Sequence, residues 1–129
     1  RFRTDHIIEM RSRYPDARIV VHPECEQEVV ALADAAGSTS FIVQYVEEAP
    51  PNSTIIIGTE INLIHRLALE HPEKNVLELH YSLCPNMFKI NPQNLLRTLE
   101  EIGTYNVVHV PEKERKDAKV ALDRMLALP

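Results

Sequence analysis

The chain has 129 residues, the length of one ordinary domain, and its apolar residues are mostly aliphatic, with no tryptophan. Its net charge of −5, without a basic stripe, excludes a typical nucleic-acid partner, and no apolar run is long enough to cross a membrane. With only two cysteines and no visible secretory signal, we expect a soluble, cytoplasmic protein whose thiols are free or bound to metal.

Hydrophobic periodicity predicts strands that alternate with helices. We interpret Thr4 as the N-cap of the first helix, Gly37 as the residue that ends the second, and Ser38 as the start of the third. In chain order we expect a helix over 4–14, a strand over 18–22, a helix over 26–36, a helix from 38 to the prolines at 50 and 51, a strand over 54–57, a helix over 61–68, a strand over 75–79, a helix over 91–102, an extended run over 105–110 and a charged helix over 111–126.

This order predicts an α/β fold. Three strands separated by helices form a small, right-handed parallel sheet with helices on both faces, which is a three-layer αβα arrangement. We expect residues 1–17 to be a helix joining from a preceding domain, residues 18–103 to be the α/β domain, and residues 104–129 to be a C-terminal extended segment and helix. Because the sequence starts within a pattern and without methionine, we expect it to come from the interior of a longer protein.

His22 and Glu24 flank Pro23 directly after the first expected strand. Loops that follow the carboxyl ends of parallel strands meet in one crevice, and a proline there turns the chain out of the sheet. A carboxylate in that position could act as a general acid or base if desolvation raised its pKa, and an imidazole could donate to a substrate oxygen. A capping Glu and a structural His are the alternative.

Ser38 and Thr39 lie in a turn of small residues that opens a helix. Free N–H groups and the positive end of the helix dipole favour a carboxylate or phosphate at such a place, and two hydroxyls would add donors. An ordinary N-cap explains the same residues.

Cys84 lies in an irregular loop after the third expected strand, where a thiolate could reach a metal ion. A zinc site of Cys25, Cys84 and His22 is conceivable, although its spacing matches no zinc motif, and a buried, inert thiol is the alternative for each cysteine. We interpret the remaining histidines as structural: His6, His65, His71, His80 and His109.

Four motifs together resemble the quinolinate synthase family in order and spacing. They are Val21-His22-Pro23-Glu24-Cys25, Ala36-Gly37-Ser38-Thr39-Ser40, Ile57-Gly58-Thr59-Glu60 with His65-Arg66-Leu67, and Cys84-Pro85-Asn86-Met87. The resemblance covers nearly the whole chain. It implies an iron–sulfur enzyme of NAD biosynthesis that condenses iminoaspartate with dihydroxyacetone phosphate to give quinolinate. It also implies three similar α/β domains around a pseudo-threefold axis, each giving one cysteine to a 4Fe–4S cluster whose fourth iron is open to substrate.

By this resemblance Cys84 looks like the cluster ligand of the third domain. His22 and Glu24 look like the substrate-contacting His and the acid–base Glu, and Ser38 and Thr39 look like the pair that binds a carboxylate or phosphate. The resemblance leaves the roles of four further motif residues open: Thr59, Glu60, Asn86 and Met87.

The other two ligand cysteines of the family precede this region, so the remaining domains of the same enzyme are the expected partners. We therefore expect the isolated chain to hold no stable cluster and to be inactive. The main alternative is a small α/β binding or interaction module without catalysis. That alternative predicts that Cys84, His22 and Glu24 do not converge, and that no apolar flank is left exposed. A zinc hydrolase is a third possibility.

Overall fold

A computed structural model describes residues 2–128 of the chain. The structure divides into two compact units, residues 2–88 and residues 89–128, which are described separately below. Residues 89–103 lie in the second of these units. The functional domain division expected from the sequence stays a prediction.

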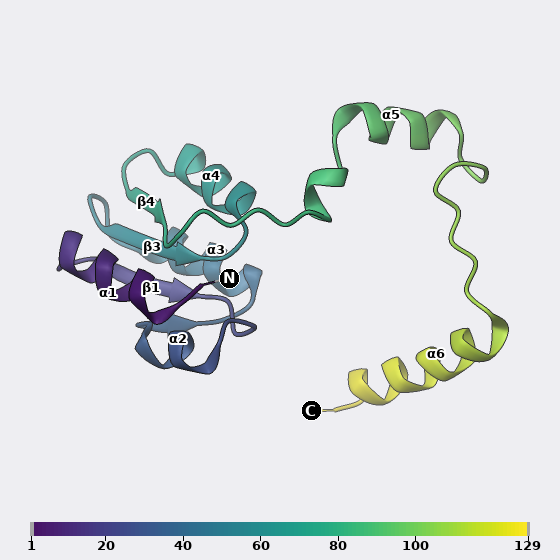
Figure 1. The fold of residues 1–129 in the computed structure, drawn as a ribbon, viewed down its shortest axis with the longest axis horizontal. Coiled ribbons are helices and arrows are strands. Elements are labelled where there is room, and N and C mark those ends of the chain that lie inside the picture. Colours follow the sequence, from purple (N-terminus) through teal and green to yellow (C-terminus); the bar gives the residue numbers. More distant parts are fainter. Residues whose placement is uncertain (1, 129) are drawn as a thin grey trace. The chain divides into compact units, whose positions relative to one another are not determined.

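The first unit contains a four-stranded, fully parallel sheet in the order β2-β1-β3-β4. The strands are β1 (Arg18–Val21), β2 (Ala35–Ala36), β3 (Thr54–Gly58) and β4 (Asn75–Glu78) (Figure 1). The runs expected at 18–22, 54–57 and 75–79 are therefore confirmed as strands, with ends that differ by one residue.

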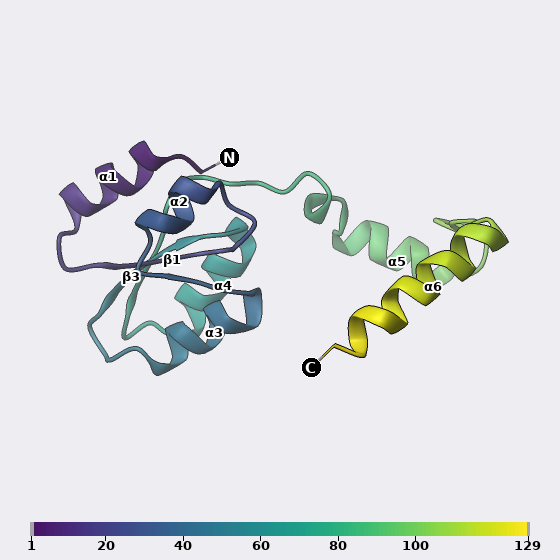
Figure 2. The same ribbon diagram turned by 90° about the horizontal axis from the view of Figure 1, so that it is seen from below.

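Helices cover both faces of this sheet, which confirms the three-layer fold. Figure 2 shows α1 (Thr4–Arg13) and α2 (Gln27–Leu32) on one face, with α3 (Thr39–Glu48) and α4 (Ile61–Glu70) on the other. The N-cap of the first helix is Arg3 and not Thr4, so Thr4 is the first residue of the helix.

The apolar strands form two cores because consecutive side chains point to opposite faces of the sheet. Ile56 packs into the core under α1 and α2, while Ile55 and Ile57 pack into the core under α3 and α4. All three side chains are almost completely buried. A continuous aliphatic run is the pattern that a strand covered on both faces requires.

The expected helix over 26–36 is wrong in its second half. The helix α2 ends at Leu32, and Ala35 and Ala36 form a fourth strand beside β1. Asp34 fixes this change: its carboxylate accepts the Ile19 N–H at 2.7 Å, and its own N–H donates to the Ile19 carbonyl at 2.8 Å. Pairing with the edge of β1 thus overrides the helical spacing of the alanines, and Gly37 follows a strand instead of ending a helix.

The strand order reverses between β1 and β3, and this reversal positions the site. From β1 the chain passes through α2 to reach β2 on one side, and it later runs from β3 through α4 to β4 on the other side. Helices that leave a sheet on opposite faces open a crevice at the carboxyl ends of the two strands between them. The register pairs Val21 with Gly58, so β1 and β3 end level with each other.

The second unit carries α5 (Pro92–Glu100) and α6 (Glu112–Leu126). Asn91 caps α5 as expected, since its side chain accepts the Asn94 N–H at 2.8 Å. The residues between the two helices form no regular element. The large apolar side chains of this unit are exposed. Among the described residues, no helix has the length and apolar character needed to cross a membrane.

Candidate functional site

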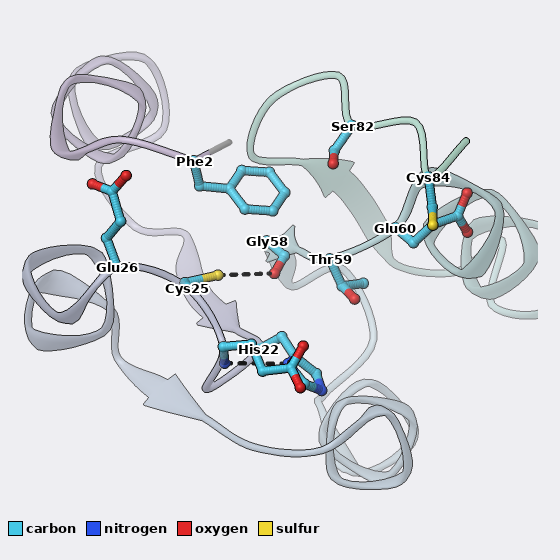
Figure 3. Close-up of a pocket in the computed structure, with 10 residues that line it drawn as sticks. Phe2, His22, Cys25, Glu26, Gly58, Thr59, Glu60, Ser82 and Cys84 are labelled. Carbon is cyan, nitrogen blue, oxygen red and sulfur yellow. Dashed lines mark hydrogen bonds and ion pairs between the residues drawn. The ribbon is translucent and has the colours of Figure 1, made fainter. Parts of the chain in front are cut away.

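A hollow of about 260 Å³ opens at the carboxyl edge of the sheet, where the strand order reverses. Its lining comes from the segments that follow β1, β3 and β4, together with Phe2 near the amino end (Figure 3). His22, Glu24 and Cys84 all line it, although Cys84 is separated from the other two by 60 or more residues. This convergence is what the binding-module alternative did not predict.

A tight turn after β1 holds His22 in place. The His22 N–H donates to the Gly58 carbonyl at 3.1 Å, and the His22 carbonyl accepts the Cys25 N–H at 3.0 Å. The Glu24 N–H donates to Nδ1 of His22 at 3.3 Å. Because Nδ1 is an acceptor here, the proton of the neutral imidazole lies on Nε2, which leaves Nε2 as a donor for a ligand.

Glu24 has a different setting from its neighbour. Its Oε2 lies 3.9 Å from Nδ1 of His22, and its side chain is 90% exposed, compared with 27% for the imidazole. The imidazole of His22 is therefore held by the turn, whereas the carboxylate of Glu24 is exposed to water. The desolvation that an acid–base carboxylate requires is not supplied by residues 2–88.

Cys25 is a packed thiol, as the structural alternative expected. Its S–H donates to the Gly58 carbonyl at 3.8 Å. Burial is the main cause that raises the pKa of this thiol, and the carboxylates of Glu24 and Glu26 act in the same direction against a hydrogen bond from the backbone at His22. A raised pKa keeps the thiol protonated, which suits packing better than metal ligation.

Cys84 is the better ligand candidate of the two cysteines. It is a free, half-buried thiol in the irregular segment after β4, and it lines the hollow. Among residues 2–128, no three His, Cys, Asp or Glu side chains are grouped so that they could hold a metal ion. The zinc site of Cys25, Cys84 and His22 is therefore not formed, and Cys84 fits a metal centre only as one ligand among others from elsewhere.

Ser38 and Thr39 are not brought into the hollow. Both are exposed at the start of α3, and the Ser38 hydroxyl accepts the Phe41 N–H at 3.2 Å as an N-cap. The Gly37 N–H donates to the Val21 carbonyl at 3.1 Å, so this turn begins beside the end of β1. The two hydroxyls thus share the carboxyl edge of the sheet with the hollow but do not line it.

Of the four motif residues whose roles the resemblance left open, two line the hollow and two do not. Thr59 and Glu60 line the hollow, and Glu60 also caps α4, since its carboxylate accepts the Asn62 N–H at 2.9 Å. Asn86 and Met87 are exposed and do not line the hollow.

Sequence reasoning missed three residues of the lining, Phe2, Glu26 and Ser82. Ser82 lies in the loop that follows β4, and the strand pattern already places such a loop at this edge of the sheet. Phe2 carries no comparable signal, because only tertiary packing brings the amino end of the described chain to this edge.

Four of the remaining histidines contact other groups. The rings of His6 and His80 stack with centroids 3.9 Å apart, His65 lies 3.9 Å from a carboxylate oxygen of Glu78, and His71 lies 3.5 Å from one of Glu73. None of these histidines lines the hollow, which agrees with their structural interpretation.

Comparison with known proteins covers almost the whole chain. A family model described as "Quinolinate synthetase A protein" matches residues 1–127. The chain is 47% identical to the quinolinate synthase of Haloarcula marismortui and 43% identical to that of Bacillus subtilis; each match covers 99% of this chain and 36% of the relative. The quinolinate synthase of Corynebacterium glutamicum is 43% identical over 99% of this chain and 34% of its own length. The chain thus spans about a third of the length of the curated relatives that it matches.

Proposed function

The chain belongs to the quinolinate synthetase A family, and from this premise we propose that it acts as the C-terminal part of a cytoplasmic quinolinate synthase. The proposed reaction condenses iminoaspartate with dihydroxyacetone phosphate to give quinolinate for NAD biosynthesis. The observation that supports it best is the convergence of His22, Glu24 and Cys84 on one hollow at the reversal of strand order.

In this proposal His22 and Glu24 handle protons and orient substrate. Nε2 of His22 is the free donor of the turn and would hydrogen-bond a substrate oxygen, while Nδ1 stays occupied by the Glu24 N–H. Glu24 would move protons during the dehydrations that close the ring, which requires its exposed carboxylate to be covered by the rest of the enzyme.

Ser38 and Thr39 would bind a carboxylate or phosphate of the substrates. The N-terminus of α3 offers its N–H groups and the positive end of its dipole, and the hydroxyl of Ser38 can still donate its proton while its oxygen caps the helix. Because these residues lie at the same sheet edge as the hollow but outside it, they would hold the charged end of a substrate whose reacting part reaches His22.

Cys84 would be the one ligand of the 4Fe–4S cluster that this chain provides. When bound, such a cluster supplies a Lewis-acidic iron. Common clusters need three or four thiolates, so the other ligands would come from the remaining domains of the enzyme. The exposed apolar faces of α5 and α6 are surfaces that these domains would cover.

Reconstitution tests this proposal. The chain is co-expressed with the part of the Bacillus subtilis relative that it does not match, and the purified assembly is assayed anaerobically for iron, sulfide and quinolinate formation. We expect a cluster and turnover from the assembly, and neither from the 129-residue chain alone.

Cysteine variants sharpen the test. Cys84→Ser should abolish the cluster signal, while Cys25→Ser, in the same hollow, should retain it. An assembly that contains both parts in stoichiometric amounts but binds no iron would contradict the proposal, as would a Cys84→Ser variant that keeps its full cluster content.

A further inference from the structure

Two hydroxyl side chains line the hollow without making a hydrogen bond that supports the fold. Thr59 and Ser82 are the buried polar residues of the described chain, with 8% and 9% of their surface exposed. Neither hydroxyl has a hydrogen-bond partner among residues 2–128. A mostly buried hydroxyl without a partner in the chain depends on water or a ligand for its hydrogen bonds, so these residues call for an explanation.

The small exposed area of both residues opens to the hollow. Within the described residues, Oε2 of Glu78 is the one fully enclosed side-chain oxygen or nitrogen that lacks a partner. The hydroxyl oxygens of Thr59 and Ser82 therefore keep contact with solvent, and Figure 3 draws both side chains around the hollow. A ligand in the hollow can take the hydrogen bonds that water makes there.

Two other partly buried hydroxyls of this chain bond to the backbone. The Ser53 hydroxyl donates to the Pro50 carbonyl at 2.7 Å, and the Thr98 hydroxyl donates to the Asn94 carbonyl at 2.8 Å. Thr59 does not cap α4, because Glu60 does so. Alanine or valine would fill the same space as Ser82 or Thr59 without burying a polar atom, so packing alone does not account for the hydroxyls.

The two hydroxyls are also held in a fixed relation. The Ile61 N–H donates to the Ser82 carbonyl at 3.1 Å, which ties the segment after β4 to the turn after β3. Thr59 directly follows Gly58, whose carbonyl accepts the His22 N–H. The pair is thus built on the same backbone frame as the candidate catalytic imidazole.

The negative charge of the side chains around the hollow favours an uncharged ligand group beside the two hydroxyls. The side chains of Glu24, Glu26 and Glu60 line it against the imidazole of His22, so a carboxylate or phosphate beside the hydroxyls would meet like charge. A hydroxyl group donates one hydrogen bond and accepts others, which suits a carbonyl next to a hydroxyl.

We propose that Thr59 and Ser82 form a subsite for the uncharged α-hydroxyketone part of the triose phosphate substrate. This inference rests on the proposed function and adds to it: the phosphate is held elsewhere, and the carbonyl and hydroxyl oxygens of the triose lie between the two side chains.

Kinetics of the reconstituted enzyme test the subsite. Thr59→Val and Ser82→Ala should each raise the KM for dihydroxyacetone phosphate at least tenfold, and should leave the KM for iminoaspartate within a factor of two. Ser12→Ala, at an exposed position of α1, is the matched control and should change neither value.

Thermal unfolding of the 129-residue chain separates binding from folding. Because neither hydroxyl bonds another group of the chain, its removal should leave Tm unchanged or raise it. Unchanged KM values in both variants of an active assembly would overturn the subsite alone. A lowered Tm together with an equal rise in the KM values for both substrates would also overturn it. An inactive unsubstituted assembly would remove the proposed function and the subsite together.

Discussion

The Gly58 carbonyl accepts the N–H of His22 at 3.1 Å, so the last residue of β3 fixes the first residue after β1. The same carbonyl accepts the Cys25 thiol. The candidate catalytic turn is therefore an extension of the sheet and not a free loop. Its geometry depends on how closely β1 and β3 approach each other at Gly58.

Gly58→Ala should destabilise the first unit by about 1–3 kcal/mol. A Cβ at this position would lie 2.8 Å from Cγ1 of Val21 and 3.1 Å from Cδ2 of Leu79, both in the buried core. Urea unfolding followed by circular dichroism measures the change. Gly103→Ala, the same substitution in the second unit, has nothing within 4 Å and should leave the unfolding of the sheet unchanged. Equal stability of Gly58→Ala and the parent chain would show that the strands can separate without loss.

Cys25 should react slowly with iodoacetamide in the folded chain. Burial raises the pKa of its thiol above the ordinary value of 9.0, so the thiolate forms only at higher pH. In a Cys84→Ser background, the midpoint of the pH–rate curve should lie above that of the same chain unfolded in urea. The unfolded chain is the control, since it has the same thiol without the burial. Identical midpoints would contradict the packed position of Cys25.

His6 should titrate below its ordinary pKa of 6.5. Burial is the main cause that lowers this pKa, and the charge of the stacked His80 adds to it. Between pH 6.5 and the lowered value, the unfolded chain binds a proton that the folded chain does not, so stability should fall as the pH falls through this window.

NMR titration of the imidazole resonances checks this pKa, and His80→Ala should move the His6 midpoint back towards 6.5, because the substitution removes both the neighbouring charge and part of the burial. An unmoved midpoint would assign the shift to other groups.

Leu99→Gln should change the free energy of unfolding by no more than about 0.5 kcal/mol, because this side chain is 58% exposed on α5. Ile56→Ala, at a buried position of β3, should cost about 2–5 kcal/mol. Chemical denaturation of both variants measures the contrast. If Leu99→Gln destabilised the isolated chain as much as Ile56→Ala, α5 would be packed within the chain and would not await the remaining domains.

Sequence patterns located the parts of the site that follow a strand. His22 and Glu24 come after a β-branched run that a proline stops, and Thr59 comes after a continuous aliphatic run. Those patterns are local, because a strand buried on both faces needs apolar residues throughout. They also predicted that Cys84 would meet His22, since parallel strands end at one edge.

Predictions from local sequence patterns were wrong where a segment bonds to residues far away in the chain. Ala33 and Ala36 have helical spacing, yet Asp34 binds the backbone of Ile19 and draws the segment into the sheet. Ser38 begins α3 as predicted, but its distance from the hollow depends on where that extra strand places the helix.

By itself the amino-acid sequence determined the three long strands, the helices that flank them and the turn of His22 and Glu24, because periodicity, proline and helix caps act over a few residues. Only the tertiary structure decided that Ala35 and Ala36 pair with β1, that the Cys25 thiol packs against Gly58, and that Ser82 faces the hollow. These outcomes depend on hydrogen bonds and burial between segments far apart in the chain, and no short stretch of sequence contains both partners.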